Sequence, residues 1–86
     1  MEKQLFKIKS NNFNIDVITT ITNLCSQYKS KIYFITNGNR ANGNSLINLI
    51  SLDLENSKEF EIEIDGQDGY QAIEVITTYL KDKSII

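Results

Sequence analysis

The 86-residue sequence contains no histidine and no proline, and its single cysteine is Cys25. Without histidine the chain lacks the imidazole nitrogen, which is nucleophilic at neutral pH. One cysteine excludes an internal disulfide and fits a reducing compartment. We find no metal-ligand cluster, no nucleophile–base pair and no glycine loop of the phosphate-binding kind. The sequence therefore predicts a protein that is not an enzyme and that uses no cofactor and no metal.

Long apolar runs and basic clusters are also missing. No apolar run approaches the roughly 20 residues that cross a bilayer, and the first residues lack the apolar segment of a secretory signal. The formal net charge is −2, and the lysines are spread along the chain, which argues against a nucleic-acid surface. We expect one domain over residues 1–86, located in the cytoplasm, with no membrane and no nucleic acid among its partners.

The hydrophobic pattern predicts four strands and three helices. Alternation or β-branched composition predicts strands at Gln4–Lys9, Lys31–Thr36, Asn39–Asn42 and 59–65. Apolar steps of three and four predict helices at Asp16–Tyr28, at 46–52 and at the end of the chain. The stripe of the last helix is Ala72, Val75, Ile76, Tyr79 and Leu80, with Asp68 near the helix start. This order, β-α-β-β-α-β-α, indicates an α+β fold with an antiparallel sheet and all helices on one side.

Local signals fix several element boundaries. Asn14 or Asn12 can cap the first helix, and Asp16 suits the positive end of its dipole. Asn37-Gly38 predicts a tight hairpin turn of type I′, which needs positive φ at both residues. Ser45 precedes the second helix as its cap. In the last strand the alternating carboxylates indicate a solvated face, which comprises Glu59, Glu61, Glu63 and Asp65.

Four signals together resemble a known family. They are the element order, the N-G turn, the serine-helix segment N-G-N-S-L-I-N-L-I-S-L over residues 42–52, and the D-G-Q-D segment over residues 65–68. They resemble HPr, the histidine phosphocarrier of the bacterial sugar phosphotransferase system. The resemblance implies the HPr-like open-faced β-sandwich, with a four-stranded antiparallel sheet and three helices on one face.

The resemblance also shows what this chain has lost. The family's G-I-H-A-R-P-A motif aligns with residues 12–18, so Asn14 stands at the position of the phosphohistidine and Asp16 at that of the arginine. An amide nitrogen is not nucleophilic, and a carboxylate repels phosphate where the arginine would pair with it. We expect no phosphohistidine chemistry here, and helix capping accounts for both residues.

A second site of the family is better preserved. In many Gram-positive HPr proteins a kinase phosphorylates the serine that opens the second helix, and Ser45 stands at that position. Beside it, Leu46, Ile47 and Ile50 could form an exposed apolar patch for a protein partner, which the resemblance identifies as an HPr-type serine kinase or a transcriptional regulator. Arg40 is a candidate partner for a phosphate on Ser45. In the alternative reading Ser45 is only a cap and the apolar residues belong to the core.

Two main hypotheses follow. The first is a regulatory or protein-binding module of the phosphotransferase system family, switched by phosphorylation at Ser45. The second is a structural or oligomerising domain on an HPr scaffold that has lost both phosphorylation sites. A small enzyme or ligand-binding domain is a third hypothesis, which would require a deep pocket with convergent polar groups.

Overall fold

The fold contains four strands and three α-helices, seen in a computed structural model that describes residues 2–86. The elements are β1 (Glu2–Lys7), α1 (Ile15–Cys25), β2 (Lys31–Thr36), β3 (Asn39–Asn42), α2 (Leu46–Leu52), β4 (Glu59–Asp65) and α3 (Gly69–Asp82). A short 3-10 helix, Leu54–Asn56, precedes β4. The predicted order β-α-β-β-α-β-α is confirmed. β1 begins two residues earlier than predicted, and α1 ends at Cys25 instead of Tyr28.

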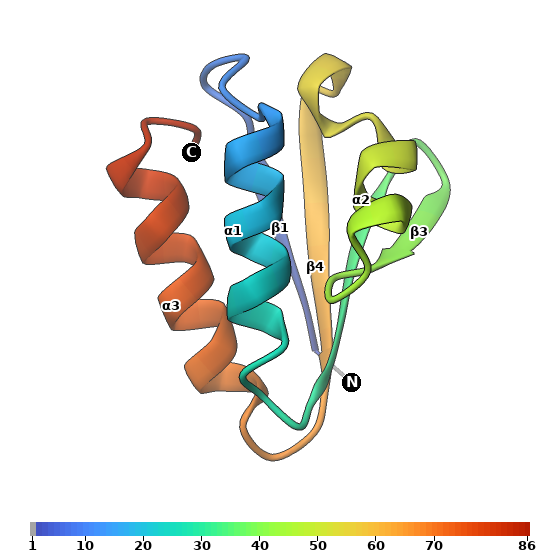
Figure 1. Ribbon diagram of the computed structural model, residues 1–86, viewed down its shortest axis with the longest axis vertical. Coiled ribbons are helices and arrows are strands. Elements are labelled where there is room, and N and C mark those ends of the chain that lie inside the picture. Colours follow the sequence, from blue (N-terminus) through green and yellow to red (C-terminus); the bar gives the residue numbers. More distant parts are fainter. Residues whose placement is uncertain (1) are drawn as a thin grey trace.

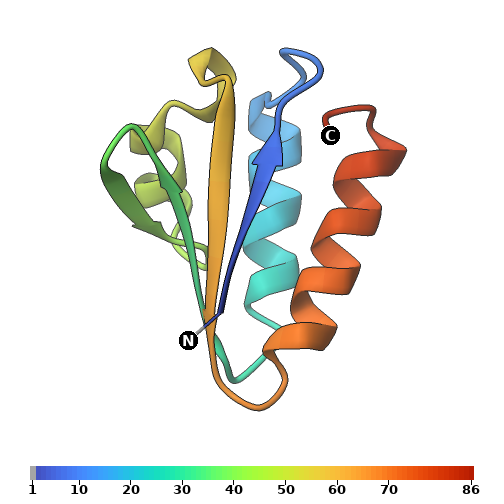
Figure 2. The same cartoon turned by 180° about the vertical axis from the view of Figure 1, so that it is seen from behind.

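The four strands form one antiparallel sheet in the order β1-β4-β2-β3. Helices α1, α2 and α3 cover one face of it (Figure 1). Figure 2 shows the other face, where the strands lie in front of the helices. The predicted open-faced arrangement is therefore confirmed. The β2–β3 turn has φ of 52° at Asn37 and 77° at Gly38, as the type I′ prediction requires.

Four phenylalanines hold the helices against the sheet. The Phe60 ring stacks with Phe6 and Phe34 at centroid distances of 5.5 and 5.7 Å, and the edge-on contact with Phe13 measures 5.6 Å. The predicted stripe of α1 is confirmed, with Val17, Ile18, Ile21 and Cys25 buried. In α3 the prediction is wrong at Val75, which is exposed, because the buried stripe runs through Ala72, Ile73, Ile76 and Leu80.

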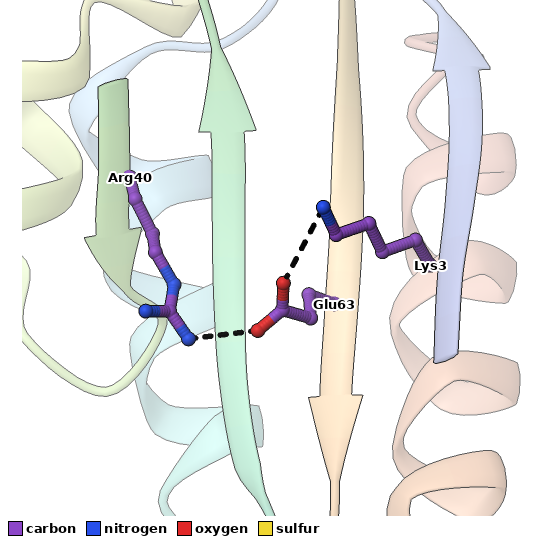
Figure 3. A network of polar contacts seen from close by, with 3 residues as sticks. All are labelled: Lys3, Arg40 and Glu63. Atoms are coloured by element: carbon purple, nitrogen blue, oxygen red, sulfur yellow. Dashed lines mark hydrogen bonds and ion pairs between the residues drawn. The ribbon is translucent and has the colours of Figure 1, made fainter. Parts of the chain in front are cut away.

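An ionic network crosses the open face of the sheet (Figure 3). Glu63 on β4 accepts a hydrogen bond of 2.7 Å from Arg40 on β3 and lies 3.8 Å from the Lys3 ammonium on β1. The Arg40 guanidinium also lies 3.7 Å from the ring centroid of Tyr33 on β2. Glu63 is only 4% exposed, so the prediction that it belongs to a solvated face is wrong. The long side chains of its neighbours cover it, and alternation along one strand cannot reveal that cover.

A second polar contact joins the loop that follows α1 to the loop that precedes α3. The Asp68 carboxylate accepts hydrogen bonds from the Lys29 and Ser30 backbone N–H groups at 2.9 and 2.8 Å, and another from the Ser30 hydroxyl. Gly66, with φ of 147°, passes so close that an added Cβ would lie 2.7 Å from the Ser30 Cα. The Ser30 hydroxyl, and then the Lys29 N–H, hold the pKa of Asp68 below its usual range.

Candidate functional site

The start of α1 is built around Asn14. Its side-chain oxygen accepts a hydrogen bond of 3.0 Å from the Val17 N–H, and its carbonyl accepts one from the Ile18 N–H at 3.0 Å. The other candidate cap, Asn12, instead donates a 3.4 Å hydrogen bond to the Lys83 carbonyl. Asn14 is therefore the N-cap, and its amide oxygen is used in holding the helix start.

A polar hollow of about 320 Å³ lies beside this cap. It is lined by Asn12, Asn14, Asp16, Val17, Thr20, Tyr79 and Lys83. Asp16 is exposed in the first turn of α1, where the helix dipole favours a carboxylate. The hollow thus presents amides, a carboxylate, hydroxyls and one ammonium. None of these pairs a nucleophile with a base, so the geometry supports capping and not phosphoryl transfer.

Ser45 caps α2 in the same way. Its hydroxyl oxygen accepts a 3.3 Å hydrogen bond from the Asn48 N–H, and its carbonyl accepts one from Leu49 at 3.0 Å. The side chain is half-buried, and the first turn of α2 holds no acidic residue. The predicted role of Ser45 as a cap is confirmed. Whether a kinase phosphorylates it remains a prediction.

Arg40 does not serve Ser45 as the sequence suggested. Its guanidinium is bound to Glu63 and stacked on Tyr33, on the face of the sheet away from the helices (Figure 3). Arg40 is therefore engaged elsewhere, and the prediction that it would partner a phosphate at this serine is wrong.

The outward side of α2 is apolar. Leu46, Ile47 and Ile50 are 36%, 76% and 48% exposed, while Leu49 and Leu52 are buried and anchor the helix. Ile50 follows Leu46 by four residues and Ile47 by three, so its side chain is a neighbour of both on the helix surface. The reading in which they belong to the core is wrong.

The structure adds Ile15 to this face. Ile15 opens α1, is 54% exposed, and lines a hollow of about 160 Å³ together with Ile50. The full lining is Phe13, Ile15, Ile18, Ile50, Asp53, Leu54 and Glu55. We call Ile15, Leu46, Ile47 and Ile50 the apolar surface. Ile15 was not predicted, because the expected helix began at Asp16; the available signal was an apolar residue directly before that helix.

Other sequence features do not add a site. Cys25 is buried, and burial raises the pKa of its thiol to about 12, so it behaves as a small apolar residue. Within residues 2–86, no group of three or more acidic, cysteine or histidine side chains is placed to hold a metal ion. Across the same residues, none of the helices has the length and apolar character needed to span a membrane.

Comparison with known proteins gives a consistent result. Residues 7–82 match the family described as the PTS HPr component phosphorylation site. The phosphocarrier protein HPr of Neisseria meningitidis serogroup A is 34% identical over 56 residues, or 65% of this chain and 63% of that protein. The HPr of Mycoplasma capricolum is 31% identical over 61 residues, covering 71% of this chain and 68% of that protein. The matched segment thus spans less than two thirds of the length of the Neisseria protein.

The fold comparison extends over nearly the whole chain. A solved structure of the histidine-containing phosphocarrier protein of Mycoplasma superposes with a TM-score of 0.89 and 24% identity. The superposition covers 99% of this chain and 98% of that one. At this identity the likeness establishes the fold.

Proposed function

The chain belongs to the HPr family of the bacterial phosphotransferase system, and from this premise we propose that it is a protein-binding module without phosphohistidine. It is not an enzyme, and it works in the cytoplasm through contacts with other proteins. The sequence contains no histidine, and Asn14 uses its side-chain oxygen to cap α1. Asp16 adds a negative charge where a phosphate would need a cation. These facts support the loss of the phosphocarrier reaction.

The exposure of the apolar surface is the observation that carries the binding role. A 76% exposed Ile47 adds little to the stability of the fold, because most of its side chain stays in water. With Leu46 and Ile50 it forms a patch on α2, and such patches often mark contacts with other proteins. Binding of a partner protein through Leu46, Ile47 and Ile50 explains why these apolar side chains are exposed to solvent.

We propose that Ser45 regulates this contact. Its hydroxyl lies at the edge of the same helix and directly precedes Leu46, so a phosphate there would place about two negative charges next to the apolar surface. The partners we propose are an HPr-type serine kinase and a transcriptional regulator that binds this surface when Ser45 is phosphorylated. Since Arg40 is engaged with Glu63, any cation that pairs with the phosphate would come from the partner.

Intact-mass measurement tests the switch. The protein is incubated with an HPr-type serine kinase and ATP, beside Ser45→Ala and Ile47→Ser. We expect one phosphate on the wild type, none on Ser45→Ala, and slower addition to Ile47→Ser because the kinase would lose an apolar contact. No added mass on the wild type, with the kinase active on an ordinary HPr, would refute the switch.

The alternative function is a structural or oligomerising domain. Burial of Leu46, Ile47 and Ile50 against the chain's own core would favour it, but all three side chains are exposed. Sedimentation over a range of protein concentrations provides a direct test: a monomer throughout would remove the oligomerising form of this alternative.

A further inference from the structure

The charged residues that line the hollow between Ile15 and Ile50, Asp53 and Glu55, are both acidic. No lysine or arginine occurs between Lys9 and Lys29 or between Arg40 and Lys58. These two cation-free stretches contain α1, α2 and the Leu54–Asn56 helix, and their acidic residues are Asp16, Asp53 and Glu55. All nine cations lie outside these two stretches of the sequence, together with the other eight of the eleven acidic residues. Arg40 lines a different hollow, with Asn48 and Ser51 of α2, and no lysine or arginine lines the hollow at Ile15 and Ile50.

Two of these carboxylates belong to the hollow itself. Asp53 and Glu55 are exposed and line it together with Ile15 and Ile50. Asp53 ends α2 in a left-handed conformation, with φ of 59°, and its carboxylate oxygens accept hydrogen bonds from the Asn56 amide at 2.9 and 3.1 Å. These contacts hold the Asp53 carboxylate in place, and Glu55 lines the same hollow.

The size of the hollow limits what can enter it. Apolar cavities of about 150 Å³ accept a benzene-sized group, and this hollow of about 160 Å³ is open to solvent. One aliphatic or aromatic side chain therefore fits between Ile15 and Ile50. A cation on the partner beside that side chain would meet Asp53 and Glu55.

We propose that the apolar surface docks a protein with a projecting apolar side chain flanked by lysine or arginine. This inference rests on the proposed function and names the chemistry of the partner for the same surface. The unbalanced carboxylates would attract a basic partner and disfavour an acidic one, because like charges brought together across an interface cost binding energy. Charge complementarity thus selects the partner, and the hollow fixes its position.

A pair of synthetic amphipathic helical peptides tests the proposal. Both carry the same stripe of leucine and phenylalanine, and their polar positions hold lysine in one peptide and glutamate in the other. Amide chemical shifts of the ¹⁵N-labelled full-length protein report where each peptide binds. We expect saturable shifts at Ile15, Ile50, Asp53 and Glu55 with the lysine peptide and none with the glutamate peptide. Binding should weaken between about 0.01 and 0.15 M salt, as the screening length falls from roughly 30 to roughly 8 Å.

Matched variants separate local charge from net charge. Asp53→Asn with Glu55→Gln should weaken the lysine peptide roughly fivefold, consistent with two partly screened ion pairs. Asparagine tolerates the left-handed conformation at position 53. Glu74→Gln with Asp82→Asn changes the net charge equally on α3 and should leave binding within about twofold.

The outcomes distinguish this proposal from the proposed function. Equal shifts from both peptides at the apolar surface would overturn the basic partner and leave the docking surface standing. Shifts at this surface from neither peptide would overturn both. Concentration-dependent shifts at the same residues without peptide would identify a second copy of this chain as the occupant and would also overturn the basic partner.

Discussion

Removing the side chain of Asn14 tests its assignment as the N-cap of α1. In Asn14→Ala the Val17 N–H loses the acceptor that lies 3.0 Å away in the wild type. Loss of an asparagine N-cap costs about 1 kcal/mol of unfolding free energy. For a domain of this size, that corresponds to a fall in melting temperature of about 4–8 °C. Urea and thermal unfolding followed by circular dichroism would measure both quantities.

Two companion variants make the reasoning refutable. Asn14→Asp keeps a side-chain acceptor and adds a charge at the positive end of the helix dipole, so its stability should stay within about 0.5 kcal/mol of the wild type. Asn12→Ala removes only the exposed 3.4 Å contact to the Lys83 carbonyl and should change stability by less than about 0.5 kcal/mol. An Asn14→Ala protein as stable as the wild type, or an equal loss in Asn12→Ala, would refute the assignment of the cap.

Three further predictions concern the network, the loop contact and the apolar surface. Glu63→Gln should lower the free energy of unfolding, measured in urea, by only about 1 kcal/mol, because Arg40 and Lys3 are half-exposed and water can solvate them when the ion pairs are lost. Glu59→Gln, at an exposed position of the same strand, should leave it almost unchanged. The pKa of Asp68 in the folded state lies below its ordinary value. Its ionised carboxylate therefore stabilises the fold above the ordinary pKa, and this stabilisation is lost as the pH falls through the lower folded value. In thermal unfolding from pH 6 to 2, the melting temperature should fall less in Asp68→Asn than in the wild type. Ile47→Ser should leave stability within about 0.5 kcal/mol, while Leu49→Ala, at a fully buried position of the same helix, should cost about 2–5 kcal/mol by the same assay.

The parts of the fold that were predictable depend on neighbours in sequence. The cap at Ser45 and the Asn37-Gly38 turn follow from the conformations that these residues favour, and the structure confirms both. Hydrophobic periodicity placed the elements for the same reason, since a helix or strand repeats its buried face at a fixed interval.

The parts that were not predictable depend on contacts between distant residues. Glu63 has the same alternating context as Glu59, and only the register that sets it opposite Lys3 and Tyr33 explains its burial. The hollow was missed because Ile15 and Ile50 are 35 positions apart and meet only when α1 and α2 pack side by side. A single sequence reveals neither the strand register at Glu63 nor the packing of α1 against α2.

Asparagine at position 14 suits the start of α1. The residue before α1 must leave the helical conformation and satisfy the N–H groups of the first turn, and asparagine is among the residues best suited to do so. On our proposal that Asn14 stands where the family carries its histidine, the helix start is kept without the nucleophile. Asp16 in the first turn favours the same helix through its dipole. The exposed side chains on α2 do not share this explanation, because capping and packing do not require a 76% exposed isoleucine at position 47. The apolar surface is thus the part of the molecule that the fold leaves unexplained, and the protein binding proposed above would account for it.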